Sequence, residues 1–280
     1  NMFVTKTKGI WVPLSTADFL DAAMNVSRGL ISMGVQAGDR VAVASSNRFE
    51  WNILDIAVQQ VGAILVPLYP NISESDYRFI LNDAGVEICV VSNQELVDKI
   101  SSVRADVPTL KHLFSFDHLD NCTHWSEIEA HKGQTDIEVV EQRMRAVQTT
   151  DLVTIIYTSG TTGRPKGVRG ALSGGMAMTP DIMKFIAAGF SNFLPIPGRT
   201  MLCGPFYHSA QWAFSFFPMI GGSTTVMQHK YDSAAMLQMI DRYSCTNVHL
   251  VPTQMKRLLD LPDEVKSEFS GASLTTVWHG

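Results

Sequence analysis

The sequence predicts an α/β fold in which two mainly parallel β-sheet lobes are covered by helices. The chain has 280 residues and is 45% apolar, so it can bury a large core or form two lobes. Short apolar runs alternate with helical patterns along its length, which is typical of parallel sheets. Residues 193–199 hold two prolines and a glycine and form the expected internal boundary.

The first predicted helix follows Ser15 and stops at Gly34. Ser15 and Asp18 have the spacing of a capping box, and glycine is a common C-terminal cap. Apolar residues repeat at helical spacing along one face, at Phe19, Ala23, Val26 and Leu30.

Further strands and helices alternate after this helix. The strands expected next are 40–45, 63–68, 86–92 and 111–116, and the helices between them are 48–62, 75–85 and 94–104. Residues 117–148 are more polar and are expected to cross the surface as short helices.

The second half of the chain begins with an apolar run at Leu152–Ile156. This run predicts a strand buried on both faces, as in a parallel sheet. Later strands are expected at 200–204, 223–228, 247–252 and 274–280, with helices between them.

Composition excludes several function classes. Net charge is −5 and only 18% of residues are charged, so the basic surplus of a nucleic-acid-binding protein is absent. The longest apolar stretch is interrupted by Gln59 and Gln60, so no membrane span is expected. The N-terminus lacks the apolar segment of a secretory signal, and the cysteines form no C-x-x-C pair. We therefore expect a cytoplasmic protein whose cysteines are small core residues.

The stretch "YTSGTTGRPKG", residues 157–167, follows the predicted buried strand. Its glycines, hydroxyl side chains and lysine suit a loop that surrounds a phosphate with donors. In open α/β sheets, ligands bind at this edge. A Walker A loop does not fit, because Pro165 replaces the required glycine and Gly167 follows Lys166. A surface turn rich in small polar residues is the alternative.

This stretch resembles the signature phosphate loop of the acyl-adenylate-forming (AMP-binding) superfamily, and in particular that of fatty-acid and other acyl-CoA synthetases. Four other segments are similar to that family: "GDRVAVASSNRFEW", "GAILVPLYPNIS", "PFYHSA" and "VPTQMKRLL". The resemblance covers nearly the whole chain. It implies the front part of an acyl-CoA synthetase-like large N-terminal domain, truncated before its β-barrel lobe and its C-terminal domain.

The resemblance implies a two-step reaction. A carboxylic acid, expected to be fatty or otherwise apolar, attacks ATP to give acyl-AMP and pyrophosphate, and coenzyme A then takes the acyl group. Mg²⁺ accompanies ATP, and no residue of this chain is assigned to the metal. The residues assigned to the triphosphate are Thr158, Ser159, Gly160, Thr161, Thr162, Gly163 and Lys166. Thr161 and Lys166 are the catalytic candidates among them, because they would stabilise charge on the phosphates.

The acid is expected near His208, which follows the strand at 200–204. By resemblance, His208 borders the carboxylate pocket and is a third catalytic candidate. Trp212 is the first candidate for an apolar acyl pocket, although core packing also explains the aromatic residues of 210–222. His279 and Gly280 would begin the adenine-binding turn.

The resemblance also implies lobe boundaries. Residues 39–192 would form the first lobe, with the phosphate loop, and residues 1–38 with 193–280 would form the second. Two other functions stay open. One is a non-catalytic nucleotide- or acyl-binding module, and the other is an aryl or amino acid adenylation domain. An isolated partial domain is expected to be incomplete for turnover.

Overall fold

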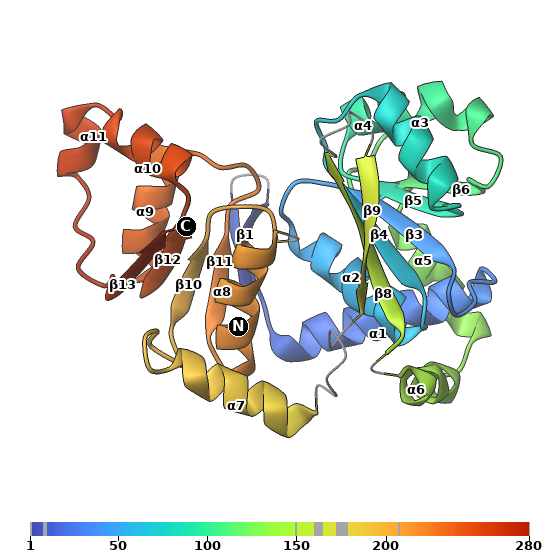
Figure 1. The fold of residues 1–280 in the computed structure, drawn as a ribbon, viewed down its shortest axis with the longest axis horizontal. Coiled ribbons are helices and arrows are strands. Elements are labelled where there is room, and N and C mark those ends of the chain that lie inside the picture. The colour runs from blue at the N-terminus through green and yellow to red at the C-terminus, as the bar shows by residue number, and fades with distance from the viewer. Residues whose placement is uncertain are drawn as a thin grey trace. The chain divides into compact units, whose positions relative to one another are not determined.

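The computed structural model describes residues 2–7, 10–148, 150–159, 165–171, 179–206 and 208–279. The chain forms two compact units, each built around a mainly parallel sheet (Figure 1). Unit 1 comprises the described residues of 1–19, 47–49 and 178–280. Unit 2 comprises those of 20–46 and 50–177. The α/β class with two helix-covered, mainly parallel sheets is confirmed.

Unit 2 holds a seven-stranded sheet in the order β7-β6-β5-β3-β4-β8-β9. Neighbouring strands are parallel except β8 and β9, which are antiparallel. The strands are β3 (Arg40–Ala44), β4 (Ile64–Leu68), β5 (Ile88–Val91), β6 (His112–Ser115), β7 (Thr123–His124), β8 (Leu152–Ser159) and β9 (Pro165–Ala171).

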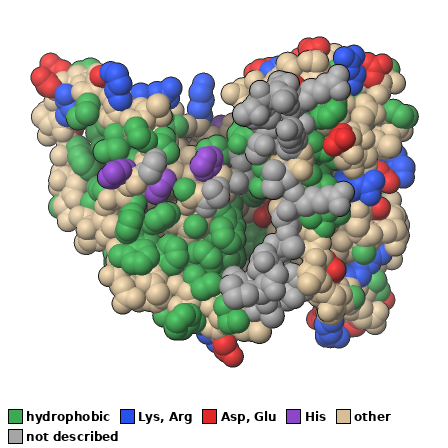
Figure 2. Space-filling model, in the orientation of Figure 1, with side chains coloured by type: hydrophobic (Ala, Val, Ile, Leu, Met, Phe, Trp, Pro, Cys, Tyr) green, Lys and Arg blue, Asp and Glu red, His purple; other side chains and the backbone are tan. Residues whose placement is uncertain are grey.

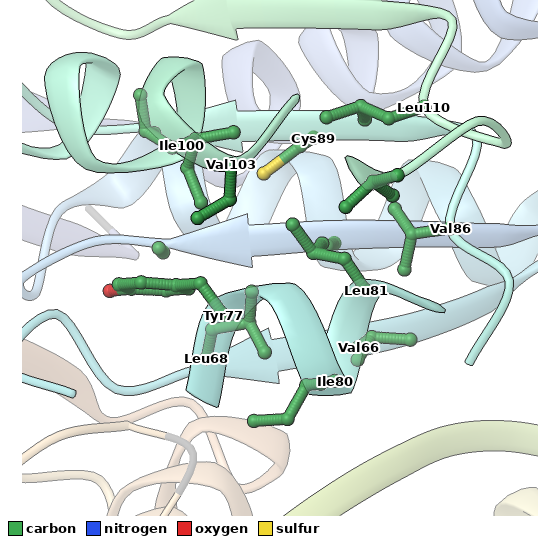
Figure 3. Packing of buried hydrophobic residues seen from close by; sticks show 14 of the residues in the cluster. Val66, Leu68, Tyr77, Ile80, Leu81, Val86, Cys89, Ile100, Val103 and Leu110 are labelled. Carbon is green, nitrogen blue, oxygen red and sulfur yellow. The ribbon is translucent and has the colours of Figure 1, made fainter. Parts of the chain in front are cut away.

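Helices connect these strands as the sequence predicted. They are α2 (Phe49–Gln60), α3 (Glu74–Asp83), α4 (Gln94–Val103), α5 (Ser126–Ala130) and α6 (Ile137–Ala146), with 3-10 turns η1 (Arg104–Asp106) and η2 (His131–Gln134). Figure 3 shows Tyr77 and Leu81 of α3 beside Ile100 of α4, over Val66 and Cys89 of the sheet. Burying each such side chain contributes about 2 kcal/mol, so this cluster fixes α3 and α4 on the sheet.

Unit 1 holds a six-stranded sheet in the order β13-β12-β10-β11-β1-β2. Only the β1–β2 pair is antiparallel among these neighbours. The strands are β1 (Phe3–Thr7), β2 (Ile10–Leu14), β10 (Arg199–Leu202), β11 (Thr224–Met227), β12 (Asn247–Leu250) and β13 (Thr276–His279). The sequence reasoning missed the β1–β2 hairpin.

Helices of unit 1 pack against this sheet. They are α7 (Pro180–Phe190), α8 (Ser209–Ile220), α9 (Ser233–Tyr243), α10 (Pro252–Leu259) and the short α11 (Asp263–Ser267). Met236 and Ile240 of α9 form one core cluster with Met201, Val226 and Val248 of the strands. Phe214 of α8 instead contacts His249 and Trp278, which are neighbours in the β12–β13 register. Because alternate strand residues face opposite sides, α8 and α9 cover opposite faces of the sheet.

Helix α1 (Thr16–Ser32) begins and ends as the sequence predicted. The Ser15 hydroxyl donates to Asp18 Oδ2 at 2.6 Å, and the Asp18 N–H donates to Ser15 Oγ at 3.1 Å. Gly34 ends the segment with φ +92°, a conformation that glycine adopts without strain. The capping interaction and the stop at Gly34 are both confirmed.

The body of α1 lies with unit 2. The Ser27 hydroxyl is 3.2 Å from the carbonyl oxygen of Ala57 and 2.7 Å from Gln60 Oε1, and both acceptors belong to the α2 region. Residues 20–38 therefore group with the sheet that contains β8 and β9, whereas the resemblance had implied the other lobe.

Strand β8 differs from the sequence expectation. Its residues Leu152–Ile156 are all half-buried, so the strand is not enclosed on both faces. The prediction was wrong because the chain turns back as β9, and this hairpin ends the sheet. Three of the cysteines, Cys89, Cys203 and Cys245, are buried, as expected for core residues.

Candidate functional site: the phosphate hairpin and the carboxyl edge of the unit 1 sheet

The predicted phosphate stretch spans an antiparallel hairpin in unit 2. Thr158 and Ser159 end β8, and they pair in register with Lys166 and Pro165 of β9. The backbone of Lys166 thus lies opposite that of Thr158. Gly160, Thr161, Thr162 and Gly163 lie outside the described residues.

Tyr157 anchors this hairpin to the body of unit 2. Its ring is buried, and its hydroxyl donates to Asp83 Oδ2 of α3 at 2.6 Å. Gly167 is the register partner of Tyr157, and a Cβ there would lie 3.3 Å from Tyr157 Cζ and 3.1 Å from Ile155 Cγ2. A glycine at 167 therefore lets the tyrosine ring lie close against β9.

In unit 1, predicted residues gather at the carboxyl edge of the parallel sheet. His208 follows β10 and is the N-cap residue of α8, with an exposed side chain that makes no capping hydrogen bond. His279 ends β13, pairs in register with Leu250 of β12 and is also exposed. Gly280 lies outside the described residues. Ligands of open α/β sheets bind at this edge.

Gln211 of α8 organises this edge, although the sequence reasoning did not select it. The N–H of Gly204, just after β10, donates to Gln211 Oε1 at 3.2 Å. This contact fixes the amide orientation, so the Gln211 NH₂ faces His249 of β12. It lies 3.1 Å from Nδ1 and 3.3 Å from the carbonyl oxygen of His249. A Cβ at position 204 would lie 2.8 Å from Gln211 Cγ, so glycine is required for this approach.

His249 is thereby held in one neutral form. Because the Gln211 NH₂ can only donate, His249 Nδ1 accepts, and the ring proton resides on Nε2. Burial, with further contributions from His208 and His279, lowers the pKa of His249 below the ordinary 6.5. The lowered pKa and the hydrogen bond both favour the uncharged ring at neutral pH.

Two more side-chain amides fix the turn between β10 and α8. Asn47 Nδ2 donates to the carbonyl oxygen of Gly204 at 2.7 Å, and Asn47 Oδ1 accepts from the N–H of Phe206 at 3.1 Å. Gln254 Nε2 donates to the carbonyl oxygen of Cys203 at 2.7 Å. The side chains of Asn47, Gln211 and Gln254 thus all bind the backbone between β10 and His208.

Aromatic side chains continue from this edge across unit 1. Four rings form a closed circuit, with centroids 5.1 Å apart for Phe190–Phe193, 5.4 Å for Phe193–Trp278, 5.3 Å for Trp278–Phe214 and 5.8 Å for Phe214–Phe190. We call these four rings and His249 the aromatic face. Figure 2 shows hydrophobic side chains gathered over unit 1 with histidines among them.

Trp212, the predicted pocket residue, lies next to this face. It is half-buried and stacks on Phe216 with centroids 4.6 Å apart, and its ring also meets Phe217 at 5.3 Å. Phe214, Phe216 and Phe217 are half-buried as well, so the aromatic residues of α8 are not plain interior packing.

Across the described ranges, no cluster of three or more His, Cys, Asp or Glu side chains has an arrangement suited to a metal ion. None of the helices described is long and apolar enough to cross a membrane.

The AMP-binding enzyme family matches residues 3–280 of the sequence. The chain belongs to this family. The family accounts for the hairpin sequence and for the two parallel sheets together.

Curated relatives of this AMP-binding chain are CoA ligases by name. "Long-chain-fatty-acid--CoA ligase FadD15" of Mycobacterium tuberculosis is 35% identical over 164 residues, covering 57% of this chain and 26% of the relative. "Putative acyl-CoA synthetase YngI" of Bacillus subtilis is 28% identical over 270 residues, covering 88% and 48%. The chain thus spans half or less of the length of these relatives.

Solved structures share the fold of this AMP-binding chain. The inhibitor-bound N-terminal domain of FACL13 from Mycobacterium tuberculosis has a TM-score of 0.78 at 20% identity, with 100% of this chain and 65% of that chain covered. The anthranilate CoA ligase AuaEII, in complex with anthranoyl-AMP, has a TM-score of 0.79 at 20% identity, with 99% and 50% covered. At such identity, the likeness shows the fold alone.

Sequence reasoning selected His208, Trp212 and the stretch 157–167 as candidates, and it did not select Gln211 or His249. Both had a signal, since a polar residue inside an otherwise apolar element must find a partner. Gln211 directly precedes the aromatic run of α8, and His249 stands between the apolar residues Val248 and Leu250 of β12.

Proposed function

We propose that this chain supplies the triphosphate-binding and acid-binding parts of an AMP-forming acid–thiol ligase. An oxygen of an apolar carboxylic acid bonds to the α-phosphorus of ATP, and the bond from that phosphorus to the bridging oxygen breaks, so pyrophosphate leaves. The sulfur of coenzyme A then bonds to the acyl carbon, AMP departs, and the thiol proton passes to solvent. Names of the relatives, which include fatty-acid–CoA ligases, support this reaction class.

The hairpin at 157–167 is the observation that carries the proposal. Its described arms β8 and β9 pair as far as Ser159 and Pro165, at the carboxyl end of β8 where parallel sheets bind ligands, and Tyr157 links β8 to α3. A stretch rich in glycine and hydroxyl residues offers N–H and O–H donors to phosphate oxygens. The proposed triphosphate contacts are Thr158, Ser159, Gly160, Thr161, Thr162, Gly163 and Lys166.

The acid is assigned to the carboxyl edge of the unit 1 sheet. His208 is exposed there and free to donate to a carboxylate, and Trp212 with its aromatic neighbours offers apolar surface for the acyl part. His279 and Gly280 are proposed to begin the turn that holds the adenine. Mg²⁺ enters as the counter-ion of ATP, and coenzyme A enters as the second substrate.

The test is ATP–pyrophosphate exchange in the whole protein that contains residues 1–280, with a panel of carboxylic acids. Lys166→Ala is expected to lower exchange about tenfold or more, because a cation near the phosphates is lost. Lys184→Ala, an exposed lysine of α7, is the matched control and should leave exchange unchanged. ATP binding without exchange for any acid would overturn the ligase proposal and favour a non-catalytic nucleotide-binding module.

A further inference from the structure

His249 carries a hydrogen-bond donor that the described part of the protein does not use. Its Nδ1 accepts from Gln211, so its proton lies on Nε2. The side chain is only 6% exposed, and no hydrogen bond to Nε2 forms within the described residues of the chain. Nε2 is not among the fully buried side-chain atoms that lack a partner within the described residues, so it keeps contact with solvent and is open to an acceptor on a ligand.

The donor lies within the aromatic face. The His249 ring is stacked on Phe214, with centroids 4.9 Å apart and planes at 27°. Its register neighbour Trp278 is 36% exposed, and Phe193 beyond it is 43% exposed. Flat rings that remain partly open offer stacking surface to another flat ring. The face therefore combines ring-stacking area with a single neutral donor.

We propose that the aromatic face binds a carboxylic acid whose ring system carries a carbonyl or another acceptor oxygen, and that His249 selects this acid by donating from Nε2. This proposal rests on the proposed ligase function and names the substrate class of the same site. The acid's ring stacks among Phe193, Phe214 and Trp278, and its acceptor oxygen pairs with the His249 donor.

A linear alkyl chain fits this face less well. Covering Nε2–H with methylene groups would exclude water without supplying an acceptor, so the penalty of an unpaired buried donor would arise on binding. Sites built around a hydrogen-bonding group reject analogues that lack the partner more strongly than apolar pockets reject a change in size. His249 therefore distinguishes between acids by whether they carry a hydrogen-bond acceptor, and not by their size.

The test compares two acids of nearly the same shape, 3-(4-acetylphenyl)propanoate and 3-(4-isopropylphenyl)propanoate, with decanoate as the linear acid. Binding to the 280-residue chain is measured by ligand-observed NMR titration into the millimolar range. The acetyl acid is expected to bind about fivefold more tightly than the isopropyl acid, the value of one neutral hydrogen bond. Decanoate is expected to bind no better than the isopropyl acid.

His249→Phe is the decisive variant. It keeps a ring against Phe214 and leaves Gln211 its bond to the backbone oxygen of residue 249, but it removes the donor. The acetyl preference should disappear in this variant and persist in His112→Phe, which changes an exposed histidine of β6. Circular dichroism checks that both variants fold.

Equal binding of the acetyl and isopropyl acids to the unaltered chain would overturn the inference, with no variant needed. Tighter binding of decanoate would also overturn it, as would no saturable binding of any of the three acids. Exchange activity with decanoate but not with the acetyl acid would defeat this inference and leave the ligase function standing. Selective binding of the acetyl acid without any ATP–pyrophosphate exchange would instead defeat the ligase function.

Discussion

Replacing Gln211 by methionine is expected to destabilise unit 1 by about 3 kcal/mol at neutral pH. Methionine matches the length of glutamine but has no amide, so the Gly204 N–H loses its acceptor and His249 Nδ1 loses its donor. Each buried group left unpaired costs about 1–3 kcal/mol. Two such groups together would cost about 2–6 kcal/mol. Gly204 is only half-buried, although His249 is 6% exposed, so the sum falls in the lower half of that range.

The assay for Gln211→Met is guanidinium unfolding, followed by fluorescence of Trp212 on the same helix. Hydrogen exchange of the Gly204 amide should accelerate in parallel, because its acceptor is gone. Gln238→Met, at an exposed position of α9, is the matched control and should stay within about 0.5 kcal/mol of the parent. If Gln211→Met unfolds like Gln238→Met and the Gly204 exchange is unchanged, the network at this edge does not stabilise the unit.

A second substitution tests the proton assignment on His249. In Gln211→Glu the carboxylate still accepts from the Gly204 N–H, but it cannot donate to His249 Nδ1. The negative charge should therefore protonate Nδ1 and raise the His249 pKa above that of the parent. Nitrogen chemical shifts of the histidine ring report both states. An Nδ1–H form in the parent would refute the derived tautomer, and an unchanged neutral Nε2–H form in Gln211→Glu would show that residue 211 does not set it.

Three further outcomes are expected. Tyr157→Phe should cost only about 1 kcal/mol in calorimetric melting, because exposed Asp83 regains water when the hydroxyl is lost, and an unaltered melting temperature would contradict that contribution. Gly29→Ala should cost about 3 kcal/mol in urea unfolding, because the new Cβ overlaps the carbonyl oxygen of Ile128, and normal stability would disprove that packing of α1. The folded pKa of His249 lies below the ordinary 6.5, so the unfolded chain takes up a proton that the folded chain excludes. The contribution of His249 to the free energy of unfolding should be constant above pH 6.5 and should fall as the pH drops from 6.5 toward the folded pKa. If the urea midpoint of His249→Phe changes with pH as steeply as that of the parent, His249 is not the source of this pH dependence.

Much of the fold could be predicted from the sequence because its local signals agree with the tertiary structure. The capping pair Ser15–Asp18 and the positive φ of Gly34 bound α1 where the residue types indicated. The β1–β2 hairpin was missed although its residues are β-rich, since "FVTKTKG" is short and partly charged. Strand β9 was missed because its pairing with β8 is non-local, and glycine-rich residues 165–171 carry little strand propensity of their own.

Residues of the candidate site could be predicted from the sequence only where they form a contiguous pattern in it. The hairpin stretch is a local pattern, and so is the placement of His208 before α8. The Gln211–His249 hydrogen bond joins residues 38 positions apart, so no spacing rule identifies it. His249 gains its role from Phe214 and Trp278, which only the sheet register and the packing of α8 bring to it.

Because Gly204 has no side chain, positions 204 and 211 are expected to change together as the sequence diverges. A Cβ there would meet Gln211 Cγ at 2.8 Å, so any side chain at 204 requires a shorter residue or a shifted helix at 211. Substitutions at this pair should be strongly non-additive, and each alone should be worse than both together. Any redesign of α8 therefore has to vary residues 204 and 211 as one unit.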